Sequence, residues 1–379
     1  MAPRITIRFA AVIVALLHAY IGLRLLPPLP IPLAVKILGA LWLVVSSVLL
    51  PAALMARRVS QPWSDRLSWA GMLAMGLFSS LLILTVARDL VLAICALAGW
   101  HPPALTWMSA AATLALALLV TLAGFFNARR LARVKTVDVP IASLPDALHG
   151  FTIAQISDIH VGPTIKRPYL ERIVERVNGL RPDAIAVTGD LVDGTVRELA
   201  AHTAPLGQLS APDGVYVVTG NHEYYSGAPA WIAELRRLGL RVLMNEHVVI
   251  ERGSAALVLA GVTDYSAGQF DPAHRSDPER AIAGAPAHAA LRILLAHQPR
   301  SAFAAAPAGF DLQLSGHTHG GQFWPWNLFV PMQQPFVAGL NRHETMQVYV
   351  SRGTGYWGPP KRFGAPSEIT LVRLVKAAP

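Results

Sequence analysis

Apolar and polar positions follow two different patterns along this chain of 379 residues. Up to residue 126, long runs of Leu, Val, Ala and Ile contain few charges, whereas residues 136–379 hold short apolar runs separated by Gly, Pro, Asp and His. Long apolar runs are typical of membrane-crossing helices, and short runs bounded by turn residues are typical of buried strands. We therefore expect an α-helical transmembrane region at residues 1–128, a basic linker at 129–149 and an α/β domain at 150–379.

Four stretches of the first region are long enough to span a bilayer core, which takes about 20 apolar residues. They are residues 5–26, 31–55, 67–98 and 104–126. The third contains Arg88–Asp89 and exceeds one untilted span, so it is a tilted helix, a helix with a charged end at the interface, or two shorter pieces. The expected number of helices is four, with five as the alternative. Residues 5–26 resemble the apolar core of a signal peptide, but no small-residue cleavage site follows, so we expect them to be retained.

Basic residues beside these stretches predict the orientation of the membrane region, because short cytoplasmic loops are enriched in Lys and Arg. The loops at 27–30 and 99–103 have no Lys or Arg, whereas the other flanks contain Arg4 and Arg8, then Arg57, Arg58 and Arg66, then Arg129, Arg130, Arg133 and Lys135. Four spans place both termini in the cytoplasm. This pattern predicts a multi-pass protein of a bacterial-type inner membrane with a cytoplasmic globular domain, while a periplasmic domain would require an odd number of spans.

Charge and cysteine content narrow the possible chemistry. The formal net charge is +9, but the globular part has no tract of interleaved basic and aromatic residues, so nucleic acid is not an expected partner. The only cysteine, Cys95, lies in an apolar run, which excludes an internal disulfide and a thiolate metal cluster. Any metal site must therefore use oxygen and nitrogen ligands. The sequence leaves the oligomeric state open.

Five strand candidates in the globular part each end in polar residues. The strands are residues 151–156, 184–188, 215–219, 291–296 and 311–315, and the polar residues that follow are Asp158, His160, Asp190, Asn221, His222, His297, His317 and His319. In open α/β sheets the carboxyl ends of strands line the crevice where ligands bind, so we expect these side chains to converge. Residues 169–180 have the spacing of a crossover helix, and the apolar runs at 256–262, 346–350 and 369–374 can supply a second sheet.

The polar residues at these strand ends have the chemistry of metal ligands. Asp, Asn and His hold divalent ions such as Mn, Fe, Zn or Mg in mixed oxygen and nitrogen coordination. Asp158 and His160 point to the same side if their segment remains extended, and Asp190, which follows a glycine, is placed to bridge two ions. Each motif alone is common at turns. Their occurrence in order, each at a strand end, favours a metal site.

In this order the motifs resemble those of the calcineurin-like metallophosphoesterase superfamily: Asp-x-His, Gly-Asp, Gly-Asn-His, a lone His and Gly-His-x-His. The form of residues 316–322, with Ser351–Gly353 further on, is similar to a bacterial membrane-associated branch that includes YaeI-type phosphodiesterases and UDP-diacylglucosamine pyrophosphatase-like enzymes. The resemblance covers residues 150–375 and implies a four-layer α/β/β/α sandwich with two divalent metal ions between the carboxyl edges of the two sheets.

The resemblance also implies a role for each matching residue. Asp158, His160, Asp190 and His319 would hold the first metal, and Asp190, Asn221, His297 and His317 the second. His222 would be the catalytic histidine beside the scissile phosphate. Glu223 or Asp193 would orient His222, or both are ordinary turn carboxylates.

The expected reaction is hydrolysis of a phosphodiester or pyrophosphate bond, in a lipid or nucleotide-lipid substrate held at the membrane. Aromatic residues after the metal histidines would form an apolar lip facing the bilayer or pack internally: Phe323, Trp324, Trp326, Phe329, Tyr356 and Trp357. Arg352, Lys361 and Arg362 would bind a phosphate or be solvated charges. The alternatives are a tethered enzyme for soluble phosphate esters, and a membrane sensor or transporter with a regulatory phosphoesterase domain.

Overall fold

The computed structural model describes residues 2–100 and 102–377, and it describes side chains from residue 9 onward except at position 57. The side chains of Arg4, Arg8 and Arg57, on which the orientation argument draws, and residues 378–379 of the expected α/β domain lie outside the described part. The chain divides into two compact units. A helical unit contains residues 1–126 and 358–363, and an α/β unit contains residues 127–357 and 364–379.

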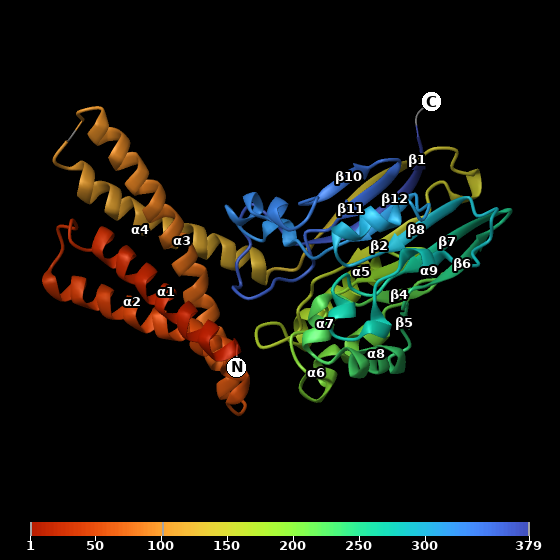
Figure 1. Ribbon diagram of the computed structural model, residues 1–379, viewed down its shortest axis with the longest axis horizontal. Helices are drawn as coiled ribbons and strands as arrows, with labels where there is room; N and C mark the ends of the chain where they lie inside the picture. Colours follow the sequence, from red (N-terminus) through yellow and green to blue (C-terminus); the bar gives the residue numbers. More distant parts are fainter. Residues whose placement is uncertain (1, 101, 378–379) are drawn as a thin grey trace. The chain divides into compact units, whose positions relative to one another are not determined.

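Four long helices form the N-terminal region: α1 (Ala2–Leu25), α2 (Leu33–Leu54), α3 (Trp63–Leu97) and α4 (Leu105–Arg129) (Figure 1). By length and composition α2, α3 and α4 can cross a membrane, whereas the apolar part of α1 in the described region, Phe9–Leu25, is shorter. Because α3 is one continuous helix, the third stretch is not two shorter pieces and the alternative of five helices is wrong. The described part of this region contains four long helices, three of which are long and apolar enough to span a membrane.

The charged side chains inside this region form local polar contacts. Nη1 of Arg88 lies 3.1 Å from Oδ1 of Asp89, and Nε of Arg24 lies 2.8 Å from Oδ2 of the same carboxylate. The ammonium group of Lys36 donates a hydrogen bond to the carbonyl oxygen of Pro27, at 2.9 Å. Arg88 is buried, and a buried charge in a helical bundle needs such partners. The contacts of Arg24 and Lys36, which are more exposed, join neighbouring helices and loops.

Two six-stranded sheets form the centre of the α/β unit. The first has the order β1-β12-β2-β3-β4-β5, and its strands are Arg133–Ile141, Glu368–Lys376, Thr152–Ile156, Ala184–Thr188, Val215–Val218 and Arg241–Val242. The second has the order β10-β11-β9-β8-β7-β6, and its strands are Gly339–His343, Met346–Val350, Leu312–Ser315, Leu291–Leu295, Ala255–Gly261 and Glu246–Arg252. Strands β2, β3 and β4 are parallel to one another, as are β7, β8 and β9.

Three apolar clusters separate four layers and confirm the α/β/β/α sandwich. Because side chains alternate between the two faces of a strand, Ala154 packs under the outer helices while Ile153 faces the other sheet. The outer helices on the first sheet are α5 (Arg167–Gly179), α6 (Val196–Thr203) and α8 (Ala228–Arg237). On the second sheet they are α9 (Pro278–Ile282) and α10 (Ala302–Ala305). The central cluster joins the inner faces of the two sheets.

The assignment of strands to the two sheets differs from the expectation that the runs at 256–262, 346–350 and 369–374 supply the second sheet. β12, which contains the run at 369–374, belongs to the first sheet, where it pairs with β1 and β2. β8 and β9 belong to the second sheet, so the strands that lead to candidate ligands come from both sheets. Residues 133–141, within the segment expected to be a linker, form β1.

Candidate metal centre

The candidate ligands lie in tight turns directly after the strands. Asp158, His160, Asp190, His317 and His319 all have positive φ, between 52° and 70°. This left-handed conformation is uncommon outside glycine and costs of the order of 1–3 kcal/mol per residue, and such strain gathers at functional sites. The premise that Asp158 and His160 continue an extended strand is therefore wrong. The left-handed backbone at each of these two residues, rather than strand alternation, directs their side chains.

One cluster of possible ligands joins Asp158, His160 and His319. Nε2 of His160 lies 3.1 Å from Nε2 of His319, which lies 3.3 Å from Oδ1 of Asp158. The backbone N–H of His317 donates to the same carboxylate at 3.0 Å and fixes it. Burial raises the pKa of Asp158, but the facing His319, His297 and His160 hold it well below its ordinary value. The carboxylate is therefore ionised, as a metal ligand must be.

A second cluster joins Asp190, His297 and His317. Nε2 of His297 lies 3.2 Å from Oδ2 of Asp190 and 3.2 Å from Nδ1 of His317. Nδ1 of His297 lies 2.7 Å from the carbonyl oxygen of Thr188, and a carbonyl only accepts, so Nδ1 carries a proton and Nε2 faces the cluster. Oδ2 of Asp190 also lies 3.9 Å from Nε2 of His160, between the two clusters.

The donor sets fit metal ions. With metal–ligand bonds of about 2.1 Å, neighbouring ligand atoms are separated by about 3.0–3.4 Å, which matches the nitrogen and oxygen separations in both clusters. Oδ1 of Asn221, a buried side chain at the start of α7 (Asn221–Tyr225), has no hydrogen-bond partner among the described residues. A buried amide oxygen is costly to leave unpaired, so a cation at this position would satisfy it.

His222 lies next to both clusters without belonging to either ligand set. Its Nδ1 lies 2.5 Å from Oδ1 of Asp193, and its Nε2 lies 3.9 Å from Oδ2 of Asp190. Burial lowers the pKa of His222, but the hydrogen bond to Asp193 and the charge of Asp190 outweigh burial and raise it to about 9. The imidazole is therefore set to carry a proton in this environment. The same Oδ1 of Asp193 lies 3.2 Å from Nδ1 of His160.

Glu223, the other carboxylate near His222 in sequence, makes different contacts. Its Oε2 accepts the backbone N–H groups of Gly220 and Asp190 at 2.7 and 2.9 Å, and its Oε1 accepts that of Leu191 at 2.7 Å. Glu223 is buried and joins the turn after β3 to the turn after β4. Of the two carboxylates expected near His222, the one that contacts the imidazole is therefore Asp193.

Comparison with known proteins identifies the family. Residues 151–321 match the model of the calcineurin-like phosphoesterase family. An uncharacterized metallophosphoesterase of Campylobacter jejuni is 34% identical over 300 residues, which are 78% of each chain. The chain is a metallophosphoesterase of this family.

The metallophosphoesterase is also similar to a vertebrate relative and, more distantly, to a solved structure. A "transmembrane protein with metallophosphoesterase domain" of Danio rerio is 40% identical over 274 residues, 69% of this chain and 62% of that one. The chain thus spans less than two thirds of the length of the curated relative it matches there. A 5'-nucleotidase precursor from Thermus thermophilus aligns at 14% identity with a TM-score of 0.39, over 59% of this chain and 55% of that one. Within the described residues, the chain thus combines a metallophosphoesterase domain with three helices that are long and apolar enough to cross a membrane.

Half-exposed aromatic rings lie on one side of the metallophosphoesterase site, two of them beside His222. The rings of Tyr225 and Trp357 lie 5.2 and 5.6 Å from the imidazole, and Phe270 lies 5.6 Å from Tyr225. Trp357 was expected at an apolar lip, whereas Tyr225 and Phe270 were missed. Tyr225 follows His222 by three residues, a spacing that puts both on one side of a helical turn and could have indicated it. We call Tyr225, Phe270 and Trp357 the aromatic rim.

The expected apolar lip is only partly exposed. Trp324, Trp326 and Phe329 are about half exposed, but Tyr356 and Phe323 are buried and pack internally. Lys361 and Arg362 are buried as well, so they are not solvated charges. Both belong to the helical unit, where the Lys361 ammonium donates hydrogen bonds to the carbonyl of Gly76 and the hydroxyl of Ser80.

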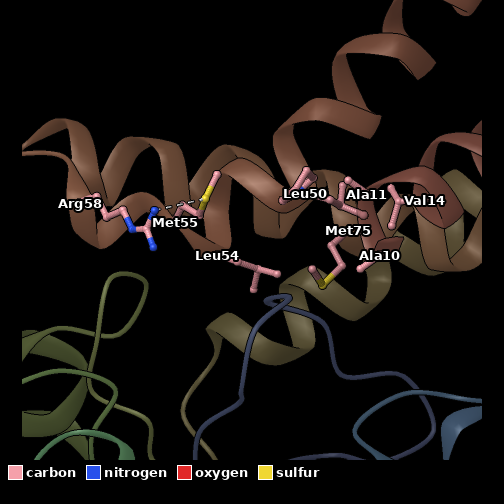
Figure 2. Close-up of a pocket in the computed structure, with 9 residues that line it drawn as sticks. Ala10, Ala11, Val14, Leu50, Leu54, Met55, Arg58 and Met75 are labelled. Carbon is pink, nitrogen blue, oxygen red and sulfur yellow. Dashed lines mark hydrogen bonds between the residues drawn. The ribbon is translucent and has the colours of Figure 1, made fainter. Parts of the chain in front are cut away.

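The helical unit also contains a pocket of about 300 Å³ (Figure 2). Residues of α1, α2 and α3 line it, together with Met55 and Arg58 at one end, where Nη1 of Arg58 lies 3.9 Å from the sulfur of Met55. The lining is apolar except for Arg58 and contains none of the candidate metal ligands.

Proposed function

We propose that this metallophosphoesterase binds two divalent metal ions and hydrolyses a phosphodiester or pyrophosphate bond in a membrane lipid or a nucleotide-lipid. The observation that carries the proposal is the position of His222, which contacts Asp193 at 2.5 Å and lies beside the Asp190 carboxylate between the two clusters. Such an arrangement supplies a proton donor next to a place where metal ions hold a phosphate.

The two ligand sets share one carboxylate. Asp158, His160, Asp190 and His319 would hold the first ion, and Asp190, Asn221, His297 and His317 the second. The geometry that supports the sharing is the placement of Oδ2 of Asp190 within 3.9 Å of histidines from both clusters. The mixed nitrogen and oxygen donors are compatible with Mn, Fe, Zn or Mg.

Each residue of the site then has a chemical task. The bound ions would lower the pKa of a water molecule and neutralise the charge that develops on the phosphate oxygens. His222, kept protonated by Asp193, donates its proton to the departing oxygen and acts as a general acid. Asp193 positions His222, and Glu223 holds together the two turns that carry Asp190 and Asn221.

A lipid component of the substrate is supported by apolar surface close to His222. The aromatic rim offers three half-exposed rings, which suit an acyl chain or another apolar substrate group. Three helices able to cross a membrane keep the enzyme where such lipids are concentrated. The bacterial-type inner membrane with the α/β unit in the cytoplasm is the location we propose. A reporter fused after Lys135 tests that orientation, because a periplasmic signal would contradict it.

The first test is hydrolysis of bis-p-nitrophenyl phosphate by the full-length protein in detergent, with and without manganese. We expect metal-dependent turnover that is lost in Asn221→Ala and His222→Ala and kept in His288→Ala, which removes an exposed histidine. Absence of metal-dependent turnover, or equal turnover in all three variants, would contradict the proposed reaction.

The substrate class needs a second comparison. We expect kcat/KM for a nucleotide-lipid pyrophosphate in mixed micelles to exceed that for the water-soluble nucleotide pyrophosphate with the same head group. Equal values would instead favour a tethered enzyme for soluble phosphate esters. A membrane sensor with a regulatory phosphoesterase domain would keep its cellular phenotype in Asp190→Asn, whereas an enzyme would lose it.

A further inference from the structure

A cavity of about 290 Å³ within the α/β unit is bounded by the segment that carries the metal histidines. Its lining includes Gly320, Trp324, Asn327, Val337, Arg352 and Ala365. Gly320 directly follows His319, a member of the first ligand cluster. The lining of the cavity therefore includes the residue that directly follows a candidate metal ligand.

The two glycines after His319 make room for this cavity's walls. Both have positive φ, 61° at Gly320 and 79° at Gly321. A Cβ atom on Gly320 would lie 3.0 Å from Cγ of Arg352, and one on Gly321 would lie 2.2 Å from the backbone nitrogen of Asn327. Any larger residue would push Arg352 or Asn327 away, so the glycine pair brings these two lining residues against the histidine turn.

The opposite wall is also attached to a ligand-bearing turn. Arg352 lies in the segment after β11, and two residues later the N–H of Thr354 donates to the carbonyl of Ser157 at 2.7 Å. The N–H of Gly355 donates to the carbonyl of Asp158 at 3.1 Å. Both walls are thus fixed to the segments that carry His319 and Asp158, and the cavity keeps a defined position relative to the first ligand cluster.

The charge around the cavity is positive. Among the described lining residues, Arg352 alone is charged, and about a third of its side chain is exposed. Its Nη1 lies 3.1 Å from Oε2 of the buried Glu368, which orients the guanidinium. The ammonium of Lys135 lies 4.0 Å from the same carboxylate oxygen, so two cations surround one carboxylate. An anion in the cavity would offset the excess positive charge.

We propose that this cavity binds the second phosphate of a pyrophosphate substrate, with Arg352 as the residue that selects it. The proposal rests on the proposed function and narrows it from phosphodiesters in general to pyrophosphates. A guanidinium forms paired, charge-assisted hydrogen bonds to phosphate oxygens, which a neutral leaving group cannot match. In the reaction, water adds its oxygen to the scissile phosphorus, the bond to the bridging oxygen breaks, and that oxygen leaves with the second phosphate and gains a proton.

Binding of the methylene-bridged analogue of uridine diphosphate, which has no bridging oxygen to cleave, is compared with binding of uridine monophosphate to the full-length, manganese-loaded protein, with calorimetry as the readout so that turnover is not required. We expect the diphosphate analogue to bind at least about tenfold more tightly than the monophosphate. Arg352→Gln should remove this preference, Arg352→Lys should keep part of it, and the affinity for the monophosphate should change less than about twofold. Arg373→Gln is the matched control, because it also removes an arginine paired with a carboxylate, here Asp138.

A second variant tests the cavity without leaving Glu368 unpaired, because an unpaired Glu368 could itself cause a folding defect. Ala338 lines the cavity, and Ala338→Phe fills it without changing any charge. It should also abolish the preference for the diphosphate. Equal affinities for the two nucleotides in the unaltered protein, or a preference that survives both Arg352→Gln and Ala338→Phe, would overturn the proposal.

Hydrolysis of bis-p-nitrophenyl phosphate is measured in parallel. If the nucleotide preference is seen without turnover, the proposed reaction is wrong and the proposed phosphate site is supported. If turnover is seen without the preference, the proposed reaction is supported and the proposed phosphate site is wrong.

Discussion

Asp193 and His222 are joined by the 2.5 Å contact between Oδ1 and Nδ1, which fixes the orientation of the imidazole next to the candidate metal centre. A carboxylate at Nδ1 keeps that nitrogen protonated and turns Nε2 toward the site, where Oδ2 of Asp190 lies 3.9 Å away. The carboxylate also stabilises the imidazolium form. Asp193 is therefore a positioning residue whose effect on catalysis passes through His222.

Asp193→Asn is predicted to lower kcat by about 10- to 100-fold, the usual effect of losing an outer-shell carboxylate. Because the same Oδ1 also lies 3.2 Å from Nδ1 of the candidate ligand His160, kcat is compared at manganese concentrations that saturate each protein, which separates positioning of His222 from weaker metal binding. Asp138→Asn, which removes a surface carboxylate paired with Arg373, is the control and should retain full activity. A variant with unchanged kcat would show that His222 does not depend on this contact.

The same substitution has a predicted pH signature in the metal-free protein. Burial lowers the pKa of His222, but Asp193 and Asp190 raise it to about 9. In the unaltered metal-free protein, the contact between the imidazolium and Asp193 therefore stabilises the fold. This contribution is complete at pH values below the ordinary pKa of 6.5. This stabilisation is lost as the pH rises through about 9. NMR titration should therefore find a lower pKa for His222 in Asp193→Asn. The difference in melting temperature between the two proteins should shrink from about pH 6 to about pH 10, and a constant difference would contradict the assignment.

Asn221→Ala tests the unpaired amide oxygen. Without metal, removing this oxygen loses no hydrogen bond at that atom. With manganese at 100 times its Kd, the unaltered protein gains about 2.7 kcal/mol of stability, and we expect the variant to lose at least about half of that gain. Asn178→Ala is the control, because both ends of the Asn178 amide are hydrogen bonded away from the centre, to Gln208 and Ser210. It should lower stability equally with and without metal, as measured by thermal unfolding.

Gly316→Ala tests the closeness of the histidine turn to Asp158. An added Cβ would lie 2.2 Å from Oδ2 of Asp158 and 2.0 Å from Oγ of Ser157, so the ligand carboxylate must move. Displacement of about 1 Å at a catalytic centre costs about 100-fold in rate, and we expect kcat/KM to fall by about that factor with reduced metal content. Gly179→Ala has open space around the added atom and should retain activity. Equal behaviour of the two variants would contradict the packing described here.

The sequence could predict the strands that lead to the site because each is a buried apolar run followed by polar residues. β3 begins and ends where expected, and β2 and β8 differ by one residue at an end. β1 was missed because its positions alternate between exposed and buried and include Arg133 and Lys135, a composition that resembles a basic linker. The sheet to which β12 belongs could not be predicted, since an apolar run has the same pattern in either sheet.

The polar residue types at the ends of these strands could be read from the sequence, but the contacts around these candidate ligands could not. The left-handed turns at Asp158 and His160 have no local signal, because Asp and His tolerate this conformation without requiring it. Phe270 reaches Tyr225 from a segment more than 40 residues later in the chain, through the packing of the two sheets. Long-range proximity of this kind depends on the whole fold.

Glu223→Gln tests the link between the two turns at the centre of the site. Both carboxylate oxygens of Glu223 accept backbone N–H groups, from Leu191 on one side and from Asp190 and Gly220 on the other. A glutamine has only one oxygen, so its NH2 group must face at least one backbone donor, and an unpaired buried donor costs about 1–3 kcal/mol. We expect lower thermal stability and weaker manganese binding, because the Asp190 turn loses its anchor. Glu198→Gln changes a carboxylate that accepts the backbone N–H of Thr195 on the surface, and it should leave manganese affinity unchanged. If manganese affinity stays the same in Glu223→Gln while stability falls, Glu223 supports the fold without holding Asp190 for the metal.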